Sequence, residues 1–292
     1  MNGSVHIFDR NLVRRHRNRA AADFTEHDFL FREIGERLAD RLDDITRRFP
    51  LAVEIGARGG LFRAIVGARG GIERLVETDL SPALLRRKAG NRLVADEELL
   101  PFAEASLDLV VSNLALHWVN DLPGCLSQIR RALKPDGLFL ASLFGGETLH
   151  ELGQALGEAE IAATGGMTPR ISPFVDVRDA GALLQRPGFA LPVVDSDRLT
   201  VSYGDALSLM RDLRSMGETN AAVERARTIA RRDVLLGAAA TYHERCADAE
   251  GRIPATFQVI YLTGWRPHES QQQPARRGSG QVSLVDALGD ED

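Results

Sequence analysis

Val53-Glu54-Ile55-Gly56-Ala57-Arg58-Gly59-Gly60 is the stretch that decides the fold, and residues 61–66 after it have the composition of a helix. A strand that ends in a glycine-rich turn and opens a helix leaves backbone N–H groups pointing at whatever docks there. In a dinucleotide-binding turn the docked group is a pyrophosphate, but position 58 is arginine and breaks the G-x-G-x-x-G spacing. The turn therefore predicts a βα unit, either with a nucleotide-like ligand or as a plain loop.

Around this turn, short apolar runs alternate with helical stretches. Continuous apolar runs are typical of parallel strands buried on both faces, and the alternation implies right-handed βαβ crossovers. A turn is predicted at Lys134-Pro135-Asp136-Gly137. The fold class is α/β, with a mostly parallel sheet and helices on both faces. We predict strands at 51–55, 74–78, 107–112, 138–143, 193–195, 199–203 and 257–263.

The composition divides the chain into three parts. Residues 1–50 are expected to form a charged helical segment that ends at Phe49-Pro50, because proline disfavours helix in the residue before it. Residues 51–265 form the ligand-binding domain, and a helical insertion at 204–250 is expected to cover its pocket. Residues 266–292, with runs of Gln, Gly and Ser, are expected to be a mobile tail.

The bulk composition excludes several classes of protein. The net charge of −5 over 292 residues argues against nucleic-acid binding. Apolar runs stay well short of the roughly 18 residues that a membrane span needs, so no span is expected. Cys125 and Cys246 suit a reducing compartment, and the N-terminus lacks the apolar core of a signal peptide. We expect a cytoplasmic protein.

Two acidic positions follow the predicted strands. Asp79 ends the second strand, where a carboxylate can accept hydrogen bonds from both ribose hydroxyls of an adenosine ligand. Asp79 could instead cap the next helix, but Ser81 followed by Pro82 suits that role better. Farther on, a carboxylate in the run Asp96-Glu97-Glu98 could accept the adenine amino hydrogen, although an isolated acidic run is more often a solvated loop.

With these residues on the page, the chain resembles the class I methyltransferase superfamily, which binds S-adenosylmethionine on a seven-stranded sheet with a terminal antiparallel strand. The resemblance implies that the glycine turn meets the methionine part of the cofactor, that Asp79 holds the ribose and that Asp96 holds the adenine. Arginine stands at position 58 where the family usually has its middle glycine. The implied cofactor-binding residues are Glu54, Gly56, Arg58, Gly60, Asp79, Leu80, Asp96, Glu97, Asn113 and Leu114.

The resemblance to one subgroup extends over about residues 6–285. That subgroup is the methyltransferase-like assembly factor of respiratory complex I, in a bacterial form, and it is similar to the methyltransferase that esterifies malonyl-acyl-carrier protein in biotin synthesis. For its mitochondrial members the resemblance implies hydroxylation of an arginine on a complex I subunit. The motifs that carry it are Phe8-Asp9-Arg10-Asn11-Leu12, Leu116-His117-Trp118-Val119-Asn120-Asp121-Leu122-Pro123, Leu143-Phe144-Gly145-Gly146-Glu147-Thr148-Leu149, Ile171-Ser172-Pro173-Phe174 and His268-Glu269-Ser270-Gln271.

The catalytic residues are less clearly marked. His117 follows the strand at 107–112 and could move a proton or simply line the pocket. An iron-dependent hydroxylase would usually need two histidines and a carboxylate, and no such ligand spacing is present, so no metal is expected. Arginines at 10, 14, 15, 17 and 19 could hold an acidic partner, cover the cofactor as a lid or form a solvated helix face. We take the solvated face as the default.

Three functions remain open. The first is an enzyme that uses S-adenosylmethionine on a protein or carrier-bound substrate, such as a complex I subunit, by methylation or hydroxylation. The second is malonyl-acyl-carrier-protein O-methyltransferase. The third is a non-catalytic assembly scaffold, which Arg58 favours slightly.

Overall fold

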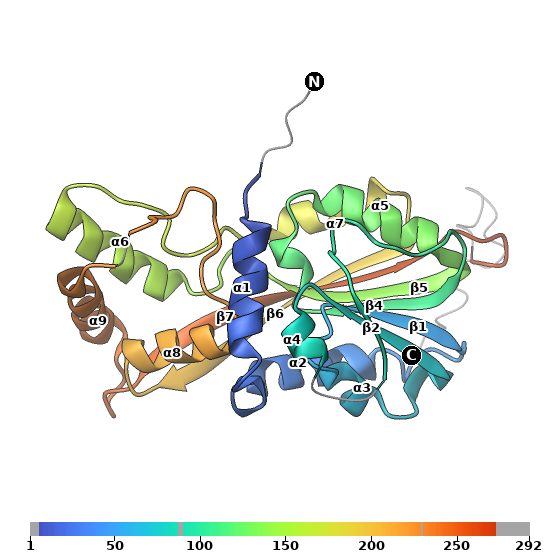
Figure 1. Cartoon of the computed structure of the whole chain (residues 1–292), viewed down its shortest axis with the longest axis horizontal. Helices are drawn as coiled ribbons and strands as arrows, with labels where there is room; N and C mark the ends of the chain where they lie inside the picture. Colours follow the sequence, from blue (N-terminus) through green and yellow to red (C-terminus); the bar gives the residue numbers. More distant parts are fainter. Residues whose placement is uncertain (1–5, 87–89, 229, 273–292) are drawn as a thin grey trace, which may run out of the picture.

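The computed structural model describes residues 6–86, 90–228 and 230–272, and a seven-stranded sheet forms its centre (Figure 1). The strand order is β3-β2-β1-β4-β5-β7-β6. The strands are β1 Leu51–Ile55, β2 Arg74–Asp79, β3 Asn91–Val94, β4 Leu107–Asn113, β5 Leu133–Phe144, β6 Ala190–Tyr203 and β7 Ile253–Trp265. β1 to β5 pair in parallel, and β7 runs antiparallel to β5 and β6. The predicted fold class is confirmed.

Helices cover both faces of the sheet. They are α1 Arg10–Ala20, α2 Phe29–Asp40, α3 Leu61–Val66, α4 Pro82–Leu85, α5 Leu122–Ala132, α6 His150–Thr164, α7 Val177–Gln185, α8 Ala206–Met216 and α9 Arg232–Cys246. α2 and α3 pack with Leu109 and Val111 of β4, whereas α5 and α7 pack with Val110. Because successive strand residues point to opposite faces, these helices lie on opposite sides of the sheet, as Figure 1 shows.

Two strands differ from the sequence prediction. β3 was not predicted, because Asn91–Val94 is an edge strand with exposed side chains and no continuous apolar run. β6 is one strand of 14 residues, where we predicted two short ones. It also lies at an edge, and most of its side chains are exposed or half-buried. Apolar patterning detects the buried centre of a sheet better than its edges.

Two predicted boundaries were wrong. The N-terminal helices end at Asp40, not at Phe49-Pro50. A turn at 41–44 and an irregular stretch follow, and they bring Phe49 into the core. The Phe49 N–H donates to the carbonyl of Gly70 at 2.8 Å. The segment predicted as a turn at 134–137 is a bulge within β5, where Asp136 has a φ of +61° and the register with β4 shifts.

Helix α1 crosses the middle of the molecule, with α6, α8 and α9 on one side of it and α4, β1, β2 and β4 on the other (Figure 1). It packs on α4 on one side and on α8 on the other. Helices α8 and α9 occupy the predicted insertion at 204–250, between β6 and β7. Of the predicted tail, residues 273–292 lie outside the described residues, and Gln271 donates to Asp136 at 2.9 Å.

Candidate functional site

Most of the predicted site residues converge at the carboxyl ends of β1, β2 and β4. This is the edge of an open parallel sheet at which ligands bind. The turn at 56–60 follows β1, and Asp79 is the last residue of β2. Backbone hydrogen bonds join the two, since the Gly56 and Ala57 N–H groups both donate to the carbonyl of Thr78 at 2.8 Å. The turn and the acid are therefore held in a fixed relation.

The glycines of the turn are required by their backbone angles and by their neighbours. Gly56 and Gly60 have φ of +73° and +79°, in the left-handed region that side chains rarely adopt. A Cβ at Gly56 would lie 2.1 Å from the Ala115 side chain, and one at Gly60 would lie 2.2 Å from Glu77 Oε1. Close packing between the turn and the neighbouring strand ends thus depends on glycine at both positions.

Asp79 is buried, and both of its carboxylate oxygens have partners. The backbone N–H of Arg58 donates to Oδ2 at 3.1 Å, and that of Ser81 donates to Oδ1 at 2.8 Å. The side chain of Ser81 caps α4 by accepting from the Leu84 N–H, as expected. The prediction that Ser81 rather than Asp79 caps this helix is confirmed, but Asp79 has a further partner, because Oδ1 also lies 3.4 Å from Nη1 of Arg17.

Glu97 is the buried centre of a second group of charges. Arg17 Nη1 donates to its Oε1 at 2.5 Å, and Arg10 pairs with Oε2. Arg10 also donates to Oδ1 of the half-exposed Asp96 at 2.6 Å. Burial opposes ionisation of Glu97, but the two guanidinium groups outweigh it and lower its pKa to about 2. Glu97 is therefore an ionised acceptor beside Asp79.

Arg17 links the two acids from helix α1. Its side chain has no exposed surface, and burial lowers its pKa, but Glu97 and Asp79 outweigh that effect and raise it. Its Nε and Nη2 atoms have no hydrogen-bond partner among the residues that the structure describes. A guanidinium thus lies between Asp79, which is predicted to hold the ribose, and Glu97, the neighbour of the Asp96 that the resemblance assigns to the adenine.

Arg58 is directed across the site toward the segment that follows α8. Its guanidinium pairs with Glu218, donates to the carbonyl of Met216 at 3.0 Å and lies 4.9 Å from the centre of the Phe31 ring. The side chain is almost fully buried. The residue that replaces the usual glycine is therefore part of a buried ion pair that ties the turn to the 204–250 segment.

His117 lies at the same ion pair. Glu218 Oε2 lies 3.0 Å from His117 Nε2 and accepts from Trp118 Nε1 at 3.0 Å. The imidazole packs against Phe144, with ring centres 4.8 Å apart, and within the described part of the chain its Nδ1 has no hydrogen-bond partner. Burial lowers the pKa of His117, so the ring is neutral at pH 7. The geometry suits a lining residue whose orientation is fixed by Glu218.

The remaining predicted residues make hydrogen bonds and packing contacts around the site. Asn113 donates to the carbonyl of Phe31 at 2.8 Å, and the Leu114 carbonyl accepts from Arg58 at 3.4 Å. Leu80 packs in a small cluster around Trp118. Glu54 is buried, and burial together with Glu77 and Asp79 raises its pKa well above the usual value.

Sequence reasoning missed two important features. Arg10 and Arg17 are turned inward, so the solvated-face default was wrong for them, although Arg14 and Arg15 are exposed as that default predicts. The spacing of the arginines places them on different sides of the helix, but the sequence does not indicate which of those sides is buried. Glu218 was also missed, because its segment resembles an ordinary helical insertion.

Within residues 6–86, 90–228 and 230–272, no group of three His, Cys, Asp or Glu side chains is arranged to hold a metal ion. No helix in those ranges has the length and apolar character needed to cross a bilayer.

Comparison with known proteins gives the class first. Residues 53–141 match the family model described as a methyltransferase domain. The fold matches the YcgJ protein of Bacillus subtilis with a TM-score of 0.55 and 14% identity, over 79% of this chain and 98% of that one. Together with the strand-end acids, these matches define a class I methyltransferase-fold protein, the class whose cofactor is S-adenosylmethionine.

Two full-length relatives give the family. The mitochondrial arginine-hydroxylase NDUFAF5 of Danio rerio is 45% identical over 97% of this chain and 89% of the relative. The malonyl-[acyl-carrier protein] O-methyltransferase of Xylella fastidiosa is 36% identical over 91% of this chain and 90% of the relative. The chain belongs to the family of methyltransferase-fold enzymes that contains these proteins, with higher identity to the arginine-hydroxylase branch.

Proposed function

We propose that S-adenosylmethionine binds at the ends of β1, β2 and β4. Asp79 would accept from the ribose hydroxyls, and Asp96 with Glu97 would accept from the adenine amino group. The turn at 56–60 would face the methionine part. When bound, the cofactor supplies an activated methyl group on a sulfonium centre.

The acceptor groups of the site fit the donor groups of this ligand. Asp79 and Glu97 are buried acceptors, and Glu97 is ionised. Ribose hydroxyls and the adenine amino group are hydrogen-bond donors, as is the Arg17 guanidinium that now lies between the two acids. Cofactor binding therefore requires Arg17 to withdraw from Asp79, and the chain has to exchange one set of donors for another.

We further propose that the enzyme hydroxylates an arginine side chain of a respiratory complex I subunit during assembly. This is a two-electron oxidation, so the oxygen atom comes from a separate oxidant of the dioxygen class and not from the methyl group of S-adenosylmethionine. The observation that carries this proposal is the 45% identity to an arginine-hydroxylase over 97% of the chain. That match includes α1 and the 204–250 segment, which lie outside the matched methyltransferase domain. A cytoplasmic location belongs to the same proposal, and the free Cys125 and Cys246 support it.

The test is mass spectrometry of complex I subunits from cells with and without this protein. We expect one arginine to gain a single oxygen in its presence, and the gain to disappear in an Asp79→Ala strain. An added methyl group on a subunit would assign methylation instead.

A second candidate is favoured by the 36% identity to a malonyl-[acyl-carrier protein] O-methyltransferase. Purified protein with S-adenosylmethionine and malonyl-acyl-carrier protein tests it directly, because methyl-ester formation would displace the hydroxylase proposal. If neither substrate is modified while complex I assembly still fails without the protein, the scaffold function is correct.

A further inference from the structure

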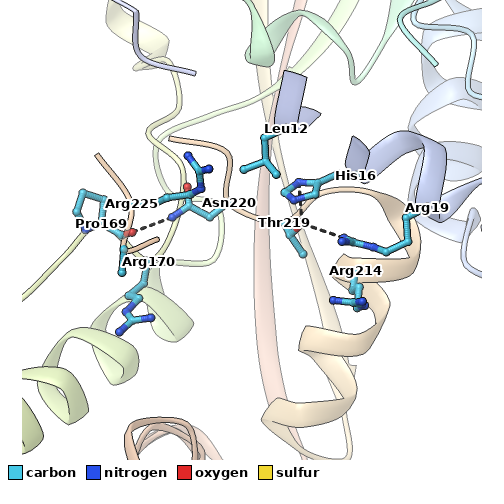
Figure 2. Close-up of a pocket in the computed structure, with 10 residues that line it drawn as sticks. Leu12, His16, Arg19, Pro169, Arg170, Arg214, Thr219, Asn220 and Arg225 are labelled. Carbon is cyan, nitrogen blue, oxygen red and sulfur yellow. Dashed lines mark hydrogen bonds between the residues drawn. The ribbon is translucent and has the colours of Figure 1, made fainter. Parts of the chain in front are cut away.

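A basic pocket lies beside helix α1, away from the strand-end acids. Figure 2 shows it between α1, the segment at 169–170 and the residues after α8. Its volume is about 350 Å³, and Arg19, Arg170, Arg214 and Arg225 all line it. Four arginines around one pocket stand out in a chain whose net charge is −5.

Two of these four charges are balanced and two are not. Arg170 pairs with Glu160, and Arg225 lies 3.4 Å from Asp9. Arg19 donates to the hydroxyl of Thr219 at 3.3 Å, and it has no carboxylate partner within the described ranges. Arg214 likewise has no ion pair there. The uncompensated charges of Arg19 and Arg214 therefore face one pocket.

The groups that neighbour Arg19 in this pocket do not neutralise its charge. The Thr219 hydroxyl also bonds to Nδ1 of the buried His16 at 2.9 Å. Burial and the charge of Arg19 lower the pKa of His16 to about 4, so this ring is neutral at pH 7. Partial burial, followed by the charge of Arg214, lowers the pKa of Arg19. An anion between the two arginines would relieve this repulsion.

An apolar cavity adjoins the basic pocket. It has a volume of about 530 Å³ and shares Arg170, Arg214, Thr219 and Asn220 with the basic pocket. Its walls are mainly leucine, isoleucine, phenylalanine and methionine side chains from α6, α8 and the segment at 171–174. Glu218 also lines it, and Glu218 holds His117. The cavity thus leads from the arginines toward the candidate site.

We propose that the two adjoining cavities bind an acidic segment of the protein substrate. One Asp or Glu carboxylate of that segment lies between Arg19 and Arg214, and its apolar neighbours occupy the cavity beside Met210 and Phe174. The charge of the pocket and the apolar walls of the cavity match a peptide with an acid next to apolar residues. The inference rests on the proposed function insofar as the bound segment belongs to the protein that is modified.

The test uses arrays of short synthetic peptides with Asp, Glu, Asn, Gln or phosphoserine at the centre and varied apolar or polar flanks. Fluorescence anisotropy measures binding to the wild-type protein and to Arg19→Gln/Arg214→Gln. Arg14→Gln/Arg15→Gln removes two exposed charges from the same helix and serves as the control. We expect acidic peptides with apolar flanks to bind at least about tenfold more weakly to the pocket variant and unchanged to the control.

Equal binding by the pocket variant, or equal binding of Asn and Asp peptides, would overturn the proposal. Tighter binding of phosphoserine peptides or of phosphopantetheine than of carboxylate peptides would also overturn it, in favour of a phosphate ester. Met210→Glu tests the apolar half and should reduce binding of apolar-flanked peptides. Calorimetry with S-adenosylmethionine on the same variants separates the two proposals, because the basic pocket can fail while cofactor binding is retained.

Discussion

At the scale of single residues, the site is a set of buried charges that satisfy one another. Asp79 and Glu97 share Arg17, while Glu218 pairs with Arg58 and holds His117. Removing one member of a buried ion pair costs several kcal/mol, because its partner is left uncompensated. Substitutions here change both stability and binding, so each test needs a measurement of both.

Asp79→Ala should weaken S-adenosylmethionine binding by more than about 1 kcal/mol, because it removes hydrogen bonds to a charged acceptor. Isothermal titration calorimetry measures the affinity, and urea unfolding confirms that the variant is folded. Asp40→Asn is the control, since Asp40 is an exposed partner of Arg69. Unchanged affinity in Asp79→Ala would remove Asp79 from the site.

The lowered pKa of His16 predicts that the protein loses stability in mild acid. Its pKa is about 4 when folded and 6.5 as the reference value, so the unfolded chain binds more protons between these limits. The contribution of His16 to the free energy of unfolding is therefore complete above pH 6.5, and it is lost as the pH falls toward 4. From pH 7 to 5, wild type should lose about 2 kcal/mol more unfolding free energy than His16→Asn.

Urea denaturation at the two pH values measures that difference. His150→Asn, at an exposed position, should keep the wild-type pH dependence. If His16→Asn loses as much stability as wild type between pH 7 and 5, His16 does not control the acid response.

At the scale of elements, the β1–α3 turn offers a matched pair of glycines. Gly60 and Gly165 have φ of +79° and +76°, but a Cβ would strike Glu77 at Gly60 and meet nothing within 4 Å at Gly165. Gly165→Ala should cost about 1 kcal/mol of unfolding free energy from its backbone angle. Gly60→Ala should cost clearly more, and it should weaken cofactor binding.

Thermal and urea unfolding of both variants give the comparison. The difference between them isolates the close approach of the turn to Glu77, since the backbone strain is common to both. Equal losses would mean that Glu77 moves aside at little cost.

Sequence patterns predicted the central elements well and the edges poorly. β1 and β4 are mostly apolar and buried on both faces, and the glycine turn with its strand-end acid is a local motif, so short windows contain their signals. The formation of β3 and the position of Phe49 depend on partners farther along the chain, which are β2 for the strand and Gly70 for Phe49. The inward direction of Arg17 and the link from Arg58 to Glu218 have the same cause, because residues far apart in sequence make those contacts.

At the scale of the whole molecule, α1 covers the strand ends and contacts the helices on both sides. Asn18 on α1 lies against Ser81 after β2, with 2.7 Å between their side-chain oxygens. A disulfide in Asn18→Cys/Ser81→Cys, made in a Cys246→Ala background, should hold α1 in this position. We expect the oxidised protein to bind S-adenosylmethionine at least about tenfold more weakly than the reduced one. The reason is that the disulfide depletes the conformation in which α1 has moved and Arg17 has left Asp79.

Thiol titration shows whether the bond has formed, and reductant should restore affinity in the same sample. Equal affinity in both states would mean that the Arg17 side chain can leave Asp79 without movement of the helix.

The position of Arg17 and Arg19 on one helix has a thermodynamic consequence. Arg17 is bound to the strand-end acids, and Arg19 lines the basic pocket two residues farther along α1. A ligand that shifts the helix at one of these sites changes the affinity for a ligand at the other site. This coupling is reciprocal: the factor by which the first ligand changes the affinity of the second equals the factor by which the second changes the affinity of the first. Helix α1 thus couples the two binding equilibria. The equilibrium between its positions without ligand sets the apparent affinity at both sites.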